Sequence, residues 1–122
     1  MWASETDVAA EAQGGDGLMV NPSKARGTAF ESAVVAYLNE HGFPHAERRA
    51  LAGAQDRGDI AGTGLMWECK NEKTINLAGY MDEVAAQTRE GELGVAVVKR
   101  RGRPTQSAYV VMTLAQFVAM IR

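Results

Sequence analysis

The chain has 122 residues, 46% of them hydrophobic, and a formal net charge of −2 at pH 7. A chain of this length can bury one hydrophobic core, so we expect a single domain with no separate specificity domain. Its one cysteine excludes an internal disulfide. No apolar run approaches the roughly 18 residues of a membrane-spanning helix, and the N-terminus lacks the basic-then-apolar order of a signal peptide. We therefore expect a cytoplasmic protein.

The N-terminal 22 residues differ from the rest of the chain in charge. They contain four acidic residues and no lysine or arginine, and they show little apolar periodicity. This composition predicts a disordered acidic tail over residues 1–22. Residues 23–122 hold thirteen basic against eleven acidic residues, a net charge of +2, and we expect them to form the single folded domain.

The first predicted helix begins near Ser23 and ends at His41-Gly42, where the glycine terminates it. Glu31 lies on its first turns, close to the basic residues Lys24 and Arg26. This glutamate is either a ligand directed at a neighbouring site or an ordinary surface residue that favours helix. Apolar residues recur along the segment at helical spacing; they are Phe30, Val34, Val35, Tyr37 and Leu38.

The next segment combines an aspartate with an acid-x-lysine triplet. Asp59 belongs to a short run, and the turn-forming residues 62–64 would fold that run back, as a hairpin, against the strand that holds Glu68 and Lys70. Side chains at positions i and i+2 of a strand leave by the same face, so Glu68 and Lys70 point together while the residues between them enter the opposite layer. The hairpin predicts that Asp59 and Glu68 meet beside the lysine.

Two carboxylates and a lysine on one face are the groups of a metal-dependent phosphodiesterase. Hard divalent cations held by carboxylates stabilise the charge that develops during phosphodiester cleavage and lower the pKa of a bound water. Asp59 and Glu68 would hold Mg²⁺, with Mn²⁺ as a substitute. Lys70 would orient or deprotonate the attacking water, or stabilise charge on the phosphate. The alternative is a surface hairpin with an ordinary cross-strand ion pair.

A crossover helix is predicted from Asn76 to Glu90, where Gly91 stops it. We expect Gln87, near its end, to be a polar residue on a solvated face. The valine-rich run Gly94–Val98 is too short for a typical helix and predicts a strand that is buried on both faces at the centre of the sheet.

The C-terminal segment predicts a loop, a strand and a helix. The basic loop 99–104 is either a nucleic-acid contact or a solvated hairpin turn. Residues 107–112 form the strand, and Thr113 is the N-cap of a helix over Leu114–Ile121. The stripe of this helix expected to face the core consists of Leu114, Phe117, Val118 and Ile121. The whole pattern predicts an α/β fold around a mixed sheet.

The order of these features resembles the PD-(D/E)xK nuclease superfamily and, within it, the archaeal-type Holliday junction resolvases and their phage relatives. The likeness covers residues 23–122. It rests on the leading helix with its early glutamate, the basic strand at 48–49, and the segments 58–62 and 67–70. Gly58 replaces the proline that usually precedes the first acid in this superfamily.

This resemblance implies a restriction-endonuclease-like αβββαβ core, with a mixed central sheet flanked by helices. It implies a divalent-metal site formed by Glu31, Asp59 and Glu68, with Lys70 as the fourth catalytic residue. In several branches a glutamine on the crossover helix lies near the metal or the DNA, which is the alternative for Gln87. A homodimer that cuts two strands of branched DNA is also implied, since a four-way junction has two symmetric scissile phosphates. Small nucleases of this kind are often phage-encoded and act in the host cell.

Basic residues flank the predicted site in several segments. Such a scatter suits contacts to phosphates, which position a duplex without reading its bases, so structure-selective cutting is expected in preference to sequence-specific restriction. The residues expected to bind DNA are Lys24, Arg26, Arg48, Arg49, Arg57, Lys73, Arg100 and Arg101. The rival interpretations are a nuclease that nicks flaps, ends or ordinary duplex, a catalytically inactive DNA-binding module, and an α/β protein without a nucleic-acid role.

Overall fold

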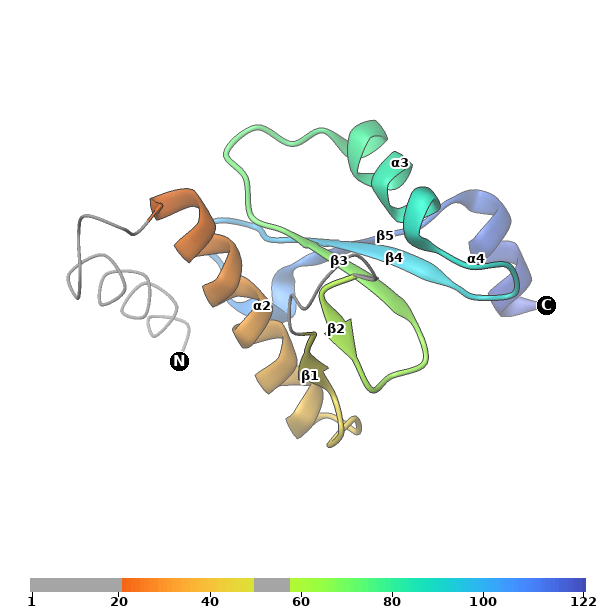
Figure 1. Cartoon of the computed structure of the whole chain (residues 1–122), viewed down its shortest axis with the longest axis horizontal. Helices are drawn as coiled ribbons and strands as arrows, with labels where there is room; N and C mark the ends of the chain where they lie inside the picture. Colours follow the sequence, from red (N-terminus) through yellow and green to blue (C-terminus); the bar gives the residue numbers. More distant parts are fainter. Residues whose placement is uncertain (1–20, 50–57) are drawn as a thin grey trace.

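A computed structural model describes residues 21–49 and 58–122 of the chain. Within these ranges the elements are α2 (Pro22–Glu40), β1 (Glu47–Arg48), β2 (Ile60–Ala61), β3 (Met66–Lys70), α3 (Leu77–Gln87), β4 (Gly94–Val98), the 3₁₀ turn η1 (Thr105–Ser107), β5 (Tyr109–Val111) and α4 (Leu114–Ile121) (Figure 1). The expected α/β class is confirmed, and the chain order from α2 to β4 is helix, three strands, helix, strand. None of the helices in the described ranges has both the length and the hydrophobicity needed to cross a membrane.

The strands form two small sheets instead of one continuous sheet. β1 pairs antiparallel with β2, while β3, β4 and β5 form a sheet with a parallel β3–β4 pair and an antiparallel β4–β5 pair. A backbone hydrogen bond of 2.7 Å from the N–H of Asp59 to the carbonyl of Trp67 connects the two sheets. Gly58, before the two-residue β2, and Gly62, directly after it, both have positive φ angles, which glycine adopts readily.

Helix α2 begins and ends at local sequence signals. Asn21 is its N-cap and accepts the backbone N–H groups of Ser23 and Lys24, with Pro22 at the first helical position. The helix ends at Glu40, and Gly42 follows with a φ of 105°, as predicted for the terminating glycine. The ordered fold therefore includes residues 21 and 22, which the sequence had placed in the tail. The expectation for residues 1–20 lies outside the described ranges.

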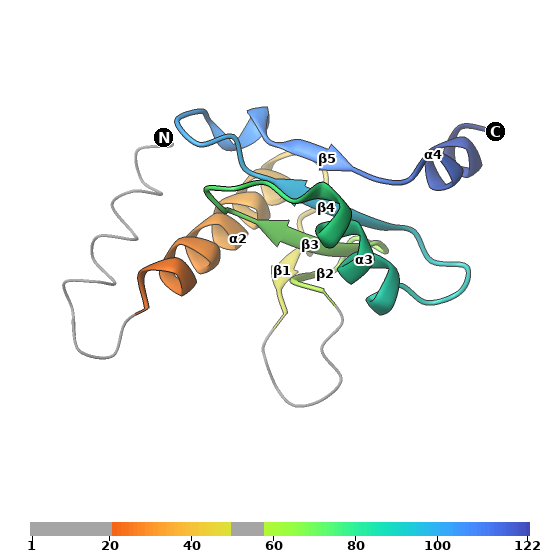
Figure 2. The same ribbon diagram turned by 90° about the horizontal axis from the view of Figure 1, so that it is seen from above.

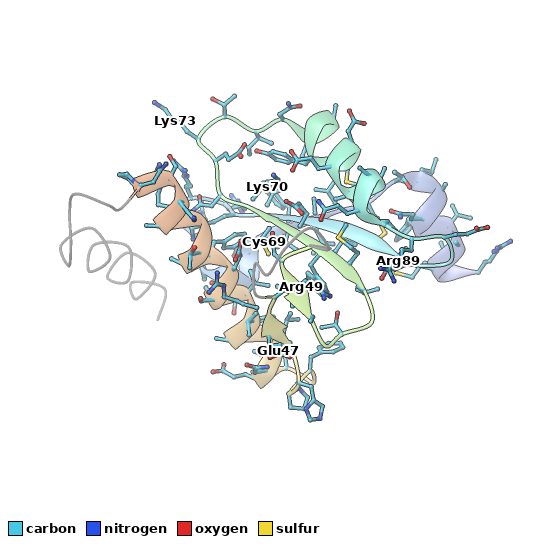
Figure 3. The ribbon with its side chains drawn as sticks, in the orientation of Figure 1. Glu47, Arg49, Cys69, Lys70, Lys73 and Arg89 are labelled. Atoms are coloured by element: carbon cyan, nitrogen blue, oxygen red, sulfur yellow. The ribbon has the colours of Figure 1, made fainter. Side chains whose placement is uncertain are left out.

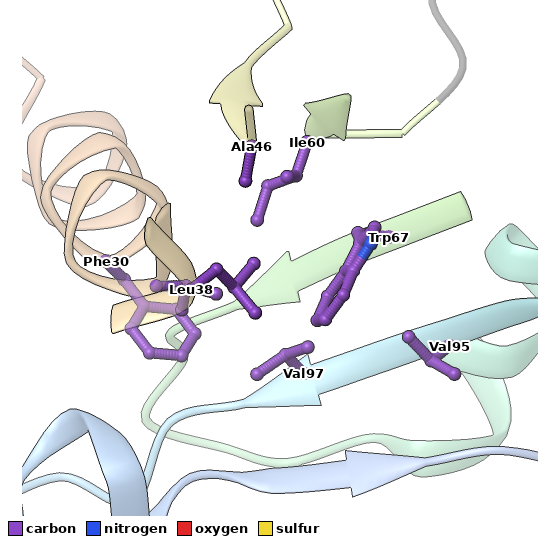
Figure 4. Close-up of a cluster of buried hydrophobic side chains, with 8 residues drawn as sticks. Phe30, Leu38, Ala46, Ile60, Trp67, Val95 and Val97 are labelled. Atoms are coloured by element: carbon purple, nitrogen blue, oxygen red, sulfur yellow. The ribbon is translucent and has the colours of Figure 1, made fainter. Parts of the chain in front are cut away.

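The larger part of the core lies between α2 and the three-stranded sheet. Side chains alternate along β4, so that Val95 and Val97 face α2 and the residues between and after them face the other way. The cluster on the α2 side is shown in Figure 4 and consists of Phe30, Val34, Leu38, Ala46, Ile60, Trp67, Val95 and Val97. Both the helix and the β1–β2 hairpin are thereby held against this face of the sheet.

Helix α3 covers the opposite face. Its buried residues Tyr80 and Val84 form a second cluster with three side chains of β3 and β4, namely Met66, Ala96 and Val98. All five residues of β4 are buried, and β4 lies between β3 and β5, so the prediction of a central strand buried on both faces is confirmed. The helix ends at Gln87 and not at Glu90, because Thr88 adopts an extended conformation and its hydroxyl donates to the carbonyl of Val84.

The C-terminal segment differs from its prediction mainly in packing. Residues 105–107 form a 3₁₀ turn after Pro104, which shortens the predicted strand 107–112 to Tyr109–Val111. Thr113 caps α4 as predicted, with its hydroxyl accepting the N–H of Gln116.

The predicted inward stripe of α4 is wrong. This helix lies beyond the end of β5 and not over the sheet (Figure 2), and none of its residues is buried among the described part of the chain. Periodicity creates an apolar face, but it supplies no neighbour to cover that face. The four stripe residues Leu114, Phe117, Val118 and Ile121 are 78%, 45%, 45% and 61% exposed.

Candidate active site

Strand β3 carries the candidate site on the face that it turns toward α3. Glu68 and Lys70 lie on the same side of the strand as Met66, while Trp67 and Cys69 contact the core on the α2 side, as the i, i+2 spacing predicts. Lys70 lies between α2 and α3 (Figure 3). The strand thus presents a carboxylate and an ammonium together at the edge of a buried layer.

Asp59 reaches this strand through both its backbone and its side chain. Its N–H donates to the carbonyl of Trp67, and its Oδ2 accepts the N–H of Cys69, each at 2.7 Å. The carboxylate is therefore held beside the backbone that links Glu68 to Lys70. The predicted contact of Asp59 with the acid-x-lysine strand is confirmed, but the predicted hairpin ladder is wrong, because β2 pairs with β1 and β3 lies in the other sheet.

Gly58 permits this close approach. Its φ is 79°, a conformation that proline cannot adopt and that other residues adopt rarely. A Cβ atom at this position would lie 2.5 Å from the carbonyl oxygen of Trp67. The backbone of this protein therefore requires glycine at position 58.

Gln87 connects the two acidic segments, in keeping with the alternative that the resemblance offered for it. Its Oε1 accepts the N–H of Gly58 at 2.7 Å, and its Nε2 donates to Oε1 of Glu68 at 3.1 Å. The interpretation of Gln87 as a residue on a solvated face is wrong, because it is half-buried over the strand. Its side-chain amide fixes both the start of the Asp59 segment and the orientation of Glu68.

Lys70 is held by two carboxylates. Its Nζ lies 2.7 Å from Oε1 of Glu83 and 3.5 Å from Oε2 of Glu68, and its side chain is 13% exposed. Burial acts to lower the pKa of Lys70, but the hydrogen bonds and charges of Glu83 and Glu68 outweigh burial and raise it. Lys70 is therefore an ammonium at neutral pH. This state favours orientation of water and stabilisation of negative charge over deprotonation of the water.

Glu83, which holds Lys70, was not predicted from the sequence. This residue precedes Gln87 by four positions on α3, a spacing that places two side chains on the same helix face. That spacing was the available signal, although it does not show which strand residues the face meets. Glu83 and Gln87 together orient Lys70 and Glu68.

Three carboxyl groups around the site have raised pKa values. Burial is the largest cause for Glu31, Asp59 and Glu68 alike. The negative charge of Asp59 further raises the pKa of both Glu31 and Glu68. The N–H of Cys69 opposes the rise at Asp59 by its hydrogen bond. Asp59 thus lies close enough to both other acids for their charges to interact, and clustered acids with shifted pKa values are typical of functional sites.

Glu31 joins the cluster from α2. Its side chain is 20% exposed, and its Oε1 lies 3.1 Å from Nε of Arg48. Of the two alternatives left by the sequence, the structure favours a position facing the other acids over a solvated surface position. Arg48, which is expected to contact DNA, is paired with this glutamate and remains 41% exposed.

The chemistry of the three acids fits a hard divalent cation. Carboxylate oxygens are the ligands that Mg²⁺ and Mn²⁺ prefer, and a cation would relieve the mutual repulsion of these groups. The side chains are held by other partners, since Glu68 is turned toward Gln87 and Lys70 while Glu31 is turned toward Arg48. As a result, no three metal-ligating side chains in the described ranges converge on one point.

The thiol of Cys69 has no nucleophilic role in this environment. Burial raises its pKa strongly, and the charges of Asp59, Glu31 and Glu68 raise it further. The thiol therefore stays protonated at neutral pH, and a protonated thiol is a poor nucleophile.

Three of the basic residues expected to bind DNA come together. Arg26, Lys73 and Arg101 line a single cavity that also reaches Lys70. They come from three segments: the start of α2, the loop after β3 and the loop after β4. The convergence of these residues follows from the fold and not from their order in the sequence.

The remaining basic residues are distributed differently. The guanidinium group of Arg100 lies 5.4 Å from the centre of the Tyr109 ring, on β5. Lys24 is exposed on the first turn of α2, and Arg49 follows β1. Arg57 lies outside the described residues. Arg100 and Arg101 thus have different contacts, Tyr109 on β5 and Asn71 after β3.

No protein-family model, curated protein or solved structure matches this chain. The proposed likeness to PD-(D/E)xK nucleases therefore depends on the residues of the site and on the order of the elements that carry them.

Proposed function

We propose that the protein is a divalent-metal-dependent endodeoxyribonuclease that hydrolyses phosphodiester bonds in branched DNA, in the manner of a Holliday junction resolvase. The supporting observation is the group formed by Asp59, Glu68 and Lys70, in which Asp59 raises the pKa of Glu68 and the lysine remains charged. Keeping acids close together and away from water costs stability. Such a cost is characteristic of sites that are selected for function.

Each side chain has a role that its contacts support. Glu31, Asp59 and Glu68 would hold Mg²⁺ or Mn²⁺, which when bound neutralises charge on the phosphate and lowers the pKa of a water. Lys70 would donate to a phosphate oxygen and stabilise the negative charge that develops there. Gln87 and Glu83 are positioning residues. Gln87 donates a hydrogen bond to the carboxylate of Glu68, and Glu83 accepts one from the ammonium group of Lys70.

The exposed apolar surface of β5 and α4 supports a homodimer. Val110 on the edge strand is 58% exposed, and Leu114 and Ile121 on α4 are also exposed. A second copy of the same chain could cover this surface through a two-fold axis, which would present two sites to the two symmetric scissile phosphates of a junction. A monomer in light scattering at micromolar concentration, with DNA present, would contradict this part of the proposal.

Cleavage of a labelled synthetic four-way junction, beside a linear duplex of the same sequences, tests the function. The wild type is compared with Lys70→Ala in Mg²⁺, with Arg89→Ala as the control for an exposed cation. We expect paired symmetric nicks in the junction alone, lost in Lys70→Ala and retained in the control.

The other outcomes distinguish the rival functions. Cutting of both substrates would discard selectivity for branches and leave a flap, end or duplex-nicking nuclease. Binding of DNA without cutting in Mg²⁺ or Mn²⁺ would indicate a catalytically inactive module.

A further inference from the structure

A cavity of about 420 Å³ lies at the carboxyl end of β3, and the chemistry proposed above leaves it without a role. Its wall includes Lys70 on one side and the cations Arg26, Lys73 and Arg101 on the others. Figure 3 shows Lys73 on the loop above the start of α2, close to Lys70 along the chain and away from Arg89 at the far end of the molecule. The cavity therefore adjoins the acidic cluster but differs from it in charge.

The hydrogen bonds of the two arginines of the cavity go to neutral acceptors. The NH2 group of Arg26 donates to the hydroxyl of Ser23 at 3.1 Å. Arg101 donates through Nε to the side-chain oxygen of Asn71 at 2.9 Å and through NH2 to its backbone carbonyl at 3.2 Å. All these acceptors are neutral. These contacts orient the guanidinium groups without neutralising them.

Arg26 also has an unused donor. Its Nε is buried and has no hydrogen-bond partner within the described part of the chain. A buried donor usually has a hydrogen-bond partner, although Nε of Arg49, which does not line the cavity, is likewise buried without one among the described residues. An anion in the cavity would be such a partner.

Among the described residues that line the cavity, the acid is Glu72, which stands against four cations. Oε1 of Glu72 accepts the hydroxyl of Tyr80 at 2.8 Å, so this carboxylate is turned toward α3. The start of α2 does not supply the site, since Asn21 already accepts its first N–H groups. Binding would thus depend on the cationic side chains.

Gly27 leaves one wall of the cavity open. It lies within α2, and a Cβ atom built there meets nothing within 4 Å. A side chain at this position can therefore extend into free space without a clash at its first atom. The helical conformation also accepts residues other than glycine, so a substitution that fills the cavity is compatible with the fold.

We propose that this cavity binds one phosphate group of a nucleic-acid strand, next to the phosphate that the acidic cluster would cleave. The planar guanidinium group of arginine matches the oxygens of a phosphate. Three cations around one recess suit a compact anion that carries several oxygens. The position of this phosphate beside the scissile one rests on the proposed nuclease function. The binding itself needs neither metal nor cleavage.

Binding of labelled single-stranded oligonucleotides in EDTA, followed by fluorescence anisotropy, tests this proposal. The variants are Arg101→Ala, which removes a cation, and Gly27→Leu, which fills the cavity. Gly27→Ala and Arg89→Ala are the matched controls. We expect each of the first two to weaken binding about tenfold and to reduce the slope of log K against log salt by about 0.7 for the lost phosphate contact. The controls should change binding less than about twofold.

The source of the phosphate is resolved by comparing oligonucleotides with a 5′-phosphate, a 3′-phosphate and neither, and by competition with inorganic phosphate. Tighter binding of one phosphorylated end, lost in both cavity variants, assigns a terminal phosphate. Equal binding of all three, weakened by both variants, assigns an internal phosphate. Either result supports the cavity as a phosphate site.

Unchanged oligonucleotide binding in Arg101→Ala and Gly27→Leu, with thermal unfolding like that of the wild type, would overturn the proposal. This failure is distinct from a failure of the nuclease function. If the wild type binds phosphate through the cavity but cuts no DNA in Mg²⁺ or Mn²⁺, only the nuclease function is contradicted. If both variants cleave normally and bind as the wild type does, only the phosphate site is contradicted.

Discussion

The region around β3 and the region formed by β5 and α4 depart from ordinary protein architecture in opposite ways. Around β3, three carboxyl groups and Lys70 are partly withdrawn from water and lie close enough for their charges to interact. On β5 and α4, large apolar side chains such as Leu114 remain in water. Proteins usually expose their charges and bury their apolar groups.

These two exceptions indicate two different kinds of binding partner. Half-buried acids that repel each other gain stability from a cation or from the ligand that the cation brings. An exposed apolar face gains stability from another apolar surface. The first region therefore indicates chemistry on a charged substrate, and the second indicates association with another protein surface.

The largest expected effect is on the β3 region. Glu68→Gln removes a charge at the proposed metal site while it retains an oxygen that can accept from Nε2 of Gln87. We expect Mg²⁺-dependent DNA cleavage to fall about 10²- to 10³-fold with little change in folding. Single-turnover cleavage rates measure the effect, with the exposed Glu90→Gln as the control. Cleavage at the wild-type rate would remove Glu68 from the site.

The apolar region is tested by Leu114→Glu. Leu114 is the most exposed of the large apolar residues of α4, and an acid in the first turn of a helix is favourable for its dipole, so the helix should persist. We expect self-association to weaken about tenfold, or about 1.4 kcal/mol. Light scattering over a dilution series provides the measurement, and Ala36→Glu on the exposed side of α2 is the control. An equal shift in both variants would indicate a general effect of charge.

Gln87→Ala tests whether the hydrogen bonds of Gln87 stabilise the β3 region. The substitution leaves the N–H of the buried Gly58 without its acceptor and Oε1 of Glu68 without its donor. We expect the free energy of unfolding to fall by about 1 kcal/mol. Denaturant unfolding measures this change, and the exposed Gln106→Ala should leave stability within about 0.5 kcal/mol of the wild type. A neutral Gln87→Ala would show that these hydrogen bonds contribute nothing to stability.

The smallest effect should be a gain in stability from Asp59→Asn. The pKa of Asp59 is raised in the folded state, so the folded protein binds its proton more tightly than the unfolded chain, and the free energy of unfolding falls as pH rises through the two pKa values. Asparagine removes this fall and can still accept the N–H of Cys69. The advantage of the variant should be absent below about pH 4 and grow to on the order of 0.5 kcal/mol at neutral pH.

The same variant also tests metal binding. Mn²⁺ should raise the melting temperature of the wild type and not that of Asp59→Asn, because a ligand that binds only the folded state stabilises it. Thermal unfolding with and without Mn²⁺, across pH, measures both effects. Equal stabilisation of both proteins by Mn²⁺ would place the cation elsewhere.

Local signals predicted those features that depend on neighbours along the chain. The N-cap Thr113, the terminating Gly42 and the valine run of β4 all appear where the sequence placed them. The return of Asp59 to the acid-x-lysine strand was also predictable, since a glycine-rich turn joins two short strands. The split between two sheets was not predictable, because it depends on which strands pair after the chain has folded.

By itself, the sequence determined the order of the elements and which residues of β3 share a face, because helix caps, turns and the two-residue period of a strand act over a few positions. Only the tertiary structure decided that Gln87 and Glu83 hold the site, that three distant cations line one cavity, and that the apolar face of α4 stays uncovered. These features depend on which surfaces meet after the chain has folded. Periodicity specifies a face of a helix, but packing selects its partner.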